Sequence, residues 1–271
     1  MGAELEELVS SLLYEGYALY PYTPDATKNA TPTPFGIVYP PAYAAECSGA
    51  HDHARLECVA ELEPSDPARP AAALSATLRY LAPTGERHEA GEQRVEIGPA
   101  AIGERVSTDL PGGRFTLRSA IDGDGRAVVR CCVHNTTEVA PGLDRAGALA
   151  RSLISVHIVV SLSAGRFQSP LEAGRESVNI WPVLASDAGD VVLGAAIALP
   201  DHPRIAPASG GNLFDNTEIE EALVLHVHAL TDAERRQAGA QDPVVRAMLE
   251  RTLAFTPEQI VALHSGLRET E

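Results

Sequence analysis

The chain is 271 residues long and carries 37 acidic against 21 basic side chains, a formal net charge of −16. A field of this sign repels phosphate backbones and anionic lipid, so we expect neither nucleic acid nor a membrane surface as a partner. Hydrophobic residues make up 45% and charged residues 21%, which is ordinary for a globular chain long enough to fold without a metal or disulfide.

The N-terminal segment predicts a short helix. Leu5, Leu8, Leu12 and Leu13 recur at helical spacing within residues 4–14. Acidic residues stand here where a secretory signal would carry positive charge. No run approaches the roughly 20 apolar residues that span a bilayer. We therefore expect a cytoplasmic protein whose four cysteines are reduced.

Residues 35–230 predict a β-rich unit. A short strand is expected at Phe35–Tyr39. Leu143–Leu153 could form a helix that leads into a buried strand at Ile154–Leu162. Short strands separated by Pro and Gly turns are typical of an antiparallel sandwich or barrel. The other candidate strands are 55–62, 72–81, 92–97, 104–110, 114–120, 126–134, 178–184, 190–198 and 218–229.

The C-terminal region predicts helices over 231–268. Thr231 with Glu234, and Thr256 with Gln259, match the capping-box pattern that begins a helix. The whole sequence thus predicts one globular unit, 1–271, of the α+β class. Its core would be a largely antiparallel β sandwich or barrel, with a short N-terminal helix and a C-terminal helical segment.

The segment Leu199–Glu221 is the first candidate functional surface. A proline- and glycine-rich loop of this length with no regular structure is more often functional or disordered than idle, and its apolar Ile205, Leu213 and Phe214 argue against disorder. Its Asp201, His202 and Glu218 are candidate catalytic residues, because carboxylates and imidazole can bind a metal or transfer protons. The same side chains could instead fasten the loop or dock a partner, and all three alternatives stay open.

Two further groups have the ligand types of a divalent metal site. Cys47 and Cys58 flank two histidines, although their spacing matches no standard zinc pattern. His226 and His228 are separated by one residue, so on a strand both rings lie on the same face. No nucleotide cofactor is expected, since phosphate-loop and dinucleotide glycine fingerprints are missing from the sequence. The candidate metal ligands are His202, Asp215, Glu218, His226, His228, His51 and His53.

Three stretches carry a resemblance to a known family. They are Leu13–Tyr22 with Lys28-Asn29 and Phe35-Gly36, then Gly165–Phe167, then Asp201–Pro203 with Phe214–Ile219. This set resembles a family of bacterial proteins encoded beside actinobacterial-type nickel–iron hydrogenases, and the similarity spans nearly the whole chain. The resemblance implies an accessory or assembly role in hydrogenase production and supplies no catalytic residue.

The leading hypothesis is therefore an accessory protein that binds a hydrogenase subunit or another accessory factor. A metal-dependent, hydrolase-like enzyme and a structural subunit of a larger complex remain the alternatives. The candidate partner-binding residues are Tyr14, Tyr17, Tyr20, Tyr22, Lys28, Asn29, Arg204, Phe214, Asp215 and Glu218.

Overall fold

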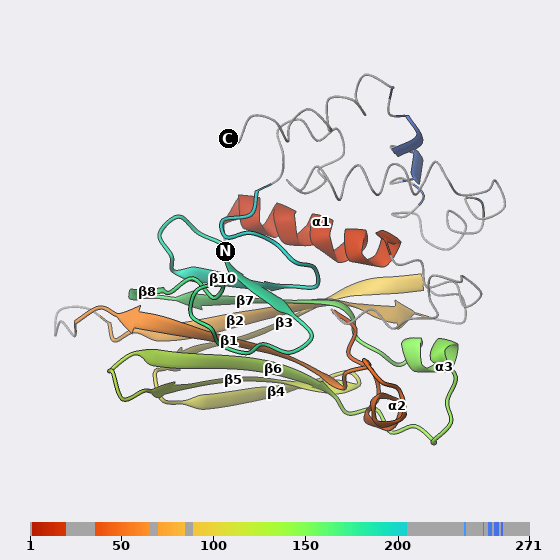
Figure 1. Cartoon of the computed structure of the whole chain (residues 1–271), viewed down its shortest axis with the longest axis horizontal. Coiled ribbons are helices and arrows are strands. Elements are labelled where there is room, and N and C mark those ends of the chain that lie inside the picture. The colour runs from red at the N-terminus through yellow and green to blue at the C-terminus, as the bar shows by residue number, and fades with distance from the viewer. Residues whose placement is uncertain are drawn as a thin grey trace.

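Within the part of the chain that the computed structural model describes, ten strands form two five-stranded antiparallel sheets (Figure 1). The structure describes residues 2–19, 36–64, 70–84 and 89–204, and also 236, 246, 249–250, 252–254 and 256. The first sheet has the order β4 (Arg105–Leu110), β5 (Gly113–Ile121), β6 (Ala127–Asn135), β1 (His53–Leu62), β8 (Gly165–Phe167). The second has the order β3 (Glu89–Ala101), β2 (Ala73–Thr84), β7 (Ile154–Leu162), β10 (Val191–Ala195), β9 (Trp181–Leu184).

Alternation of side chains along the first sheet decides which of its faces is buried. On β6, Val129, Cys131 and Val133 are fully buried, whereas Arg130 and His134 retain exposure. Successive side chains of a strand point to opposite faces, so one face enters the core and the other meets solvent. The interior between the sheets is filled by large apolar side chains, including Leu56, Phe115, Leu117, Leu78 and Ile158.

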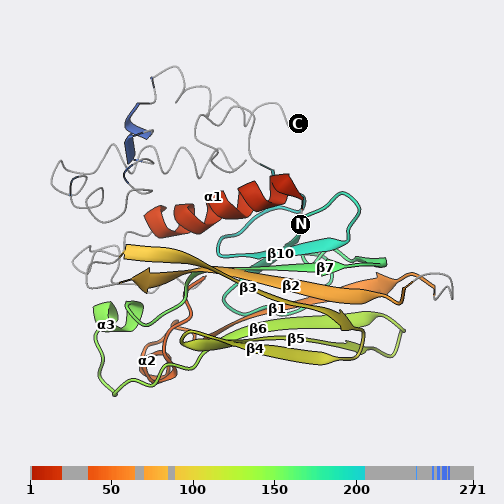
Figure 2. The same cartoon turned by 180° about the vertical axis from the view of Figure 1, so that it is seen from behind.

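The central strand of the second sheet, β7, is buried on both faces. Eight of the nine residues of β7 are buried, because one face packs on the first sheet and the other lies under a helix. That helix is α1 (Ala3–Leu19), which runs across the sheet in Figure 1. Leu8, Val9 and Leu12 are buried in the cluster that joins α1 to the sheet. The order of layers is therefore helix, sheet, sheet (Figure 2), and none of the described helices lies on the outer face of the first sheet.

A buried arginine joins α1 to the second sheet. Arg79 on β2 is only 3% exposed. Its guanidinium donates to Glu92 Oε1 at 2.8 Å, to the Glu6 carbonyl oxygen at 3.1 Å and to Ser10 Oγ at 2.8 Å. A buried charge is costly unless it is paired and fully hydrogen-bonded, and here it is both.

The expected architecture is confirmed at the level of two largely antiparallel sheets with few helices. Phe35–Tyr39 was expected to be a strand, but Val38 makes isolated bridges and belongs to none of the ten strands. The helix expected over 143–153 is shorter, and α3 spans Arg145–Leu149. Neither α2 (Pro41–Glu46) nor the three-residue β8 was expected from the sequence.

The C-terminal expectations fall largely outside the described residues. The strand expected at 218–229 lies wholly outside them. Of the helices expected over 231–268, isolated helical positions are described, together with the pairs 249–250 and 252–253, so a C-terminal helical segment is not supported. Among the described helices, none is long and apolar enough to cross a membrane.

Candidate functional site

Asp201 fastens the start of the 199–221 segment to β9. One carboxylate oxygen accepts a hydrogen bond from the Leu184 backbone N–H at 2.7 Å, and the other accepts from the Ser169 hydroxyl. The next residue, His202, donates its backbone N–H to the Leu184 carbonyl at 2.7 Å. Both oxygens of Asp201 are thus used to hold the loop against the end of the strand. This arrangement favours a structural role over proton transfer for Asp201.

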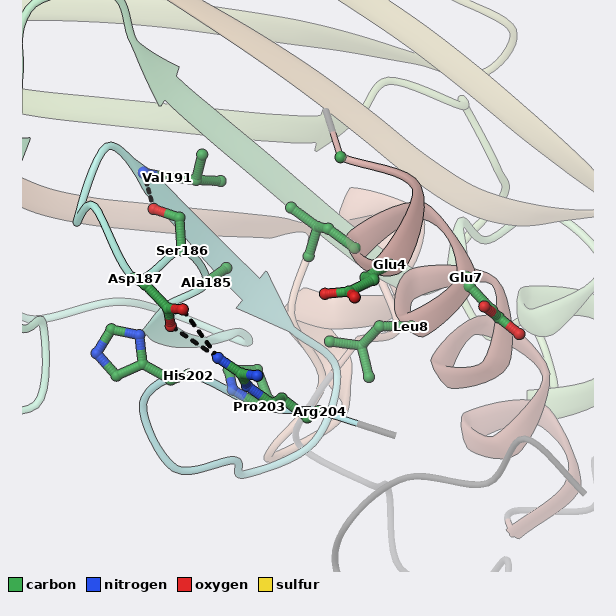
Figure 3. A pocket seen from close by; sticks show the side chains of 12 residues that line it. Glu4, Glu7, Leu8, Ala185, Ser186, Asp187, Val191, His202, Pro203 and Arg204 are labelled. Atoms are coloured by element: carbon green, nitrogen blue, oxygen red, sulfur yellow. Dashed lines mark hydrogen bonds and ion pairs between the residues drawn. The ribbon is translucent and has the colours of Figure 1, made fainter. Parts of the chain in front are cut away.

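A groove lies between this loop and the first turns of α1, and we call it the α1 groove. Its volume is about 510 Å³. Figure 3 shows Glu4, Glu7 and Leu8 of α1 on one side and the segment that carries Asp187, with Arg204, on the other. The lining residues are Gly2, Glu4, Leu5, Glu7, Leu8, Ala185, Ser186, Asp187, Val191, His202, Pro203 and Arg204.

The α1 groove mixes acidic and apolar surface. Arg204 Nη2 donates to both carboxylate oxygens of Asp187, at 2.9 and 3.0 Å, so its charge is compensated there. Two further carboxylates, Glu4 and Glu7, come from the first turns of α1, where acidic side chains favour the helix dipole. The groove therefore presents more negative than positive charge.

Most candidates from the sequence lie outside the described residues. Tyr14 and Tyr17 belong to α1, but the structure describes their backbone alone. The catalytic set Asp201, His202 and Glu218 cannot be assembled, because only its first two members are described. The candidates that lie wholly outside are Tyr20, Tyr22, Lys28, Asn29, Phe214, Asp215, Glu218, His226 and His228.

The cysteine and histidine group at residues 47–58 does not converge. Cys58 is fully buried between the sheets, whereas His53 lies at the outer face of the first sheet. These two positions are five residues apart on one strand, so their side chains point to opposite faces. Within the described ranges, no group of three or more His, Cys, Asp or Glu side chains is placed to hold a metal ion.

The outer face of the first sheet carries a second candidate site, which was not among the sites expected from the sequence. The cross-strand register places side chains of β4, β5, β6 and β1 in three parallel rows. The first row is Asp109, Arg114, His134 and His53. The second is Ser107, Thr116, Cys132 and Arg55. The third is Arg105, Arg118, Arg130 and Glu57.

These rows enclose a hollow of about 280 Å³, which we call the arginine hollow. Its middle row has the short side chains Thr116 and Cys132, and longer arginines stand in the rows on either side. The difference in side-chain length produces the depression on an otherwise flat sheet. The lining residues are His53, Arg55, Arg105, Arg114, Thr116, Arg118, Arg130, Cys132 and His134.

One end of the hollow holds a chain of titratable groups. Asp52 Oδ1 lies 2.8 Å from His53 Nδ1, and the His53 ring stacks on His134 with centroids 5.2 Å apart. His134 Nε2 lies 3.1 Å from Cys132 Sγ. Burial lowers the pKa of His134, and the neighbouring His53 lowers it further. Burial also raises the pKa of Cys132 to about 11, although Arg55 and Arg130 oppose that shift, so Cys132 is a neutral thiol at pH 7.

The sequence held one signal for this site. Arg114, Thr116 and Arg118, and likewise Arg130, Cys132 and His134, follow the two-residue period of one strand face. The strands at 114–120 and 126–134 were both expected, but their register was not readable from the residues. The register is what brings four arginines from three strands beside Arg55 on a fourth.

Comparison with known proteins adds no identification: no protein-family model matches the chain, and no curated protein matches it either.

Proposed function

We propose that this chain is a binding protein, not an enzyme, and that it serves the production of a nickel–iron hydrogenase. Its partner would be a hydrogenase subunit or another accessory factor. The resemblance of Leu13–Tyr22, Gly165–Phe167 and the 201–219 segment to proteins encoded beside such hydrogenases supports the partner class. The observation that supports binding over catalysis is the engagement of both Asp201 oxygens in fastening the loop.

The α1 groove is the surface we assign to that partner. It combines the apolar Leu8 and Val191 with carboxylates from α1 and with Asp187. A partner segment of complementary character would present one or two apolar side chains flanked by basic residues. Complementary charge raises the association rate and excludes wrong partners, while apolar contacts supply most of the affinity.

The two alternatives are a hydrolase-like enzyme and a purely structural subunit. A hydrolase-like site would need Glu218 beside Asp201 and His202, and Glu218 lies outside the described residues. A purely structural subunit predicts obligate co-elution with its complex. Neither alternative is favoured by a contact among the described side chains.

Affinity purification from the native host under gentle conditions tests the proposal. Glu4 is exposed at the start of α1 and lines the groove, so Glu4→Lys reverses a charge without disturbing the core. We expect wild-type protein to recover a hydrogenase subunit or accessory factor, and Glu4→Lys to reduce that recovery at least fivefold.

Glu138→Lys is the matched control, because Glu138 is also exposed but lies in the segment after β6, away from the groove. Equal recovery by wild type, Glu4→Lys and Glu138→Lys would remove the groove from the proposal. Recovery of no hydrogenase component by the wild type would overturn the assigned partner.

A further inference from the structure

The arginine hollow has the opposite charge from the chain that forms it. The chain as a whole carries −16, yet five arginines and two histidines line this hollow and no carboxylate does. Three carboxylates stand at its edge, and one of them is Asp52, whose Oδ1 lies 2.8 Å from His53 Nδ1. Asp109 Oδ1 accepts from Arg114 Nε at 2.7 Å, and Glu57 Oε2 accepts from Arg130 Nε at 2.7 Å. Two of the five guanidinium charges are therefore compensated.

The remaining three guanidinium groups have no carboxylate partner among the described residues. Arg105 and Arg118 make no ion pair there. Arg55 Nη2 donates weakly to the Glu176 carbonyl at 3.4 Å, and its Nε is buried without any hydrogen-bond partner. The Arg55 guanidinium is therefore not neutralised by a carboxylate within the described structure.

The register adds electrostatic repulsion at the same place. Arg105 lies directly opposite Arg118, and Arg118 lies directly opposite Arg130. Neighbouring strands are about 4.8 Å apart, and like charges that face each other across a strand pair destabilise the sheet. Glu57 relieves this repulsion only at the Arg130 end of the row. Folding alone gives no reason for such a row, whereas an anion lying over it would be attracted by every member.

The floor of the hollow supplies neutral hydrogen-bond groups. Thr116 Oγ1 and Ser107 Oγ lie 2.9 Å apart and share one hydrogen bond, so one of the two hydroxyl protons is left for another acceptor. Cys132 contributes a neutral thiol beside Thr116, so no negative charge from the floor opposes an anion. Arginine forks above a hydroxyl-lined floor match the several acceptor oxygens of a tetrahedral oxyanion.

We infer that the arginine hollow binds a phosphate group, either as inorganic phosphate or as the ester of a small metabolite, held by Arg55, Arg105 and Arg118. A phosphate group concentrates up to two negative charges on one compact centre, which suits three uncompensated guanidinium groups better than a single carboxylate does. A hollow of about 280 Å³ lies at the lower end of the sizes of small-molecule sites, so the ligand is a small one. This site is distinct from the α1 groove and does not depend on the hydrogenase assignment.

Isothermal titration calorimetry at 150 mM salt tests the assignment with three probes. The probes are inorganic phosphate, glycerol 3-phosphate and citrate. We expect both phosphate compounds to bind, and to bind more tightly than citrate. Tighter binding of glycerol 3-phosphate would identify an ester as the natural source, and tighter binding of inorganic phosphate would identify the free ion.

Variants at the two unpaired arginines make the test specific. Arg105→Gln and Arg118→Gln are expected to lower phosphate affinity at least tenfold without lowering the melting temperature, because each removes repulsion and breaks no ion pair within the described structure. Arg166→Gln is the control: this exposed arginine of β8 lies in the same sheet but outside the hollow, where it pairs with Glu61 at 3.1 Å. We expect it to bind phosphate as the wild type does.

Three outcomes would overturn the inference. The first is no heat of binding with either phosphate compound, and the second is equal affinity in wild type, Arg118→Gln and Arg166→Gln. The third is tighter binding of citrate than of either phosphate compound. That result would mark a surface that attracts negative charge without selecting a compact tetrahedral oxyanion.

Discussion

Arg118 on β5 and Arg130 on β6 face each other directly across the pair of strands, on the solvent side of the first sheet. Arg130 is compensated by Glu57, which is 7% exposed and is the one buried acidic residue among those that the structure describes. Arg118 has no such partner among the described residues. The opposed pair Arg118 and Arg130 therefore leaves a local excess of positive charge on an acidic protein.

Arg118→Gln should stabilise the protein in the absence of ligand. Removing a like charge from a directly opposed pair is expected to raise the free energy of unfolding by about 0.5 kcal/mol. Urea denaturation at low salt measures the change, and the gain should shrink in 1 M salt because charges are screened there. Arg114→Gln is the comparison: it loses the hydrogen-bonded pair with Asp109 and should show no gain.

Sulfate binding at the arginine hollow should strengthen as the pH falls. A bound anion favours the imidazolium form of His134, whose pKa is held low by burial and by His53 in the ligand-free protein. The other ionisable groups around the ring are Asp52, Cys132 and Arg114. Sulfate does not titrate in this range, so calorimetry between pH 8 and pH 5 reports on the protein's own groups, and His134→Gln should flatten the part of the dependence that belongs to His134.

Arg79→Met should destabilise the protein by about 2 kcal/mol. The variant leaves Glu6 and Glu92 without their buried partner, but both side chains are about one-third exposed, so water compensates part of the loss. Hydrogen exchange should quicken most in α1, since Arg79 is the polar link between that helix and β2.

Arg94→Met tests whether burial of the ion pair is what makes Arg79 important, because both arginines pair with Glu6. Arg94 also pairs with Glu6, at 2.8 Å, but its side chain is 41% exposed. We expect a loss below about 1 kcal/mol, as for other exposed pairs. Equal losses in the Arg94 and Arg79 variants would contradict the role assigned to burial.

His157 should make the protein less stable in mild acid. The ring is fully buried on β7, with Nδ1 donating to the Ser155 carbonyl at 2.8 Å and Nε2 accepting from Ala196 N–H at 3.4 Å. Burial lowers its pKa to about 4, with the nearby Arg79 charge acting in the same direction. In the unfolded chain histidine titrates near 6.5, so between about pH 6.5 and pH 4 the unfolded state binds the extra proton.

Stability attributable to His157 is therefore complete above pH 6.5 and falls by about 3 kcal/mol as the pH drops to about 4. Chemical denaturation of wild type and His157→Gln across this range measures the difference. The variant should be less stable at pH 7 but should lose less on acidification. Parallel pH profiles for the two proteins would show that other groups carry the effect.

Asp201→Ala should loosen the 199–204 segment. Two hydrogen bonds to the carboxylate are lost, and the Leu184 N–H is left without its acceptor, so we expect a loss of about 2 kcal/mol. Asp201→Asn keeps one acceptor oxygen and should lose about half as much. Thermal unfolding of both variants and of Ser169→Ala provides the comparison, and a fully stable Asp201→Ala would show that the fastening contributes nothing.

The positions of most strands along the sequence were predictable from the residues. Candidate strands at 55–62, 104–110, 114–120 and 126–134 match β1, β4, β5 and β6 closely, because apolar alternation and Gly or Pro turns are local signals. The buried histidine was also predictable, since His157 stands alone in an apolar run. By contrast, α2 and β8 are too short to carry a periodic pattern, and they were missed.

The candidate sites were less predictable than the strands. Asp201 was a candidate catalytic residue in the sequence, but its hydrogen-bond partners Leu184 and Ser169 are 17 and 32 residues away, and nothing local indicates them. The twelve-residue cysteine and histidine group looked suited to a metal until strand alternation separated His53 from Cys58. His53 instead stacks on His134, a residue from another strand.

The sequence by itself determined the acidic charge, the β-rich composition and most strand positions, because each depends on residue type and short-range periodicity. Only the tertiary structure decided which positively charged side chains lie close together. Arg55, Arg105, Arg118 and Arg130 are up to 75 residues apart in the chain, and only the antiparallel register of β4, β5, β6 and β1 places them around one hollow. Register depends on long-range hydrogen bonding and core packing, so a positive site could form within a chain whose overall charge argues against one.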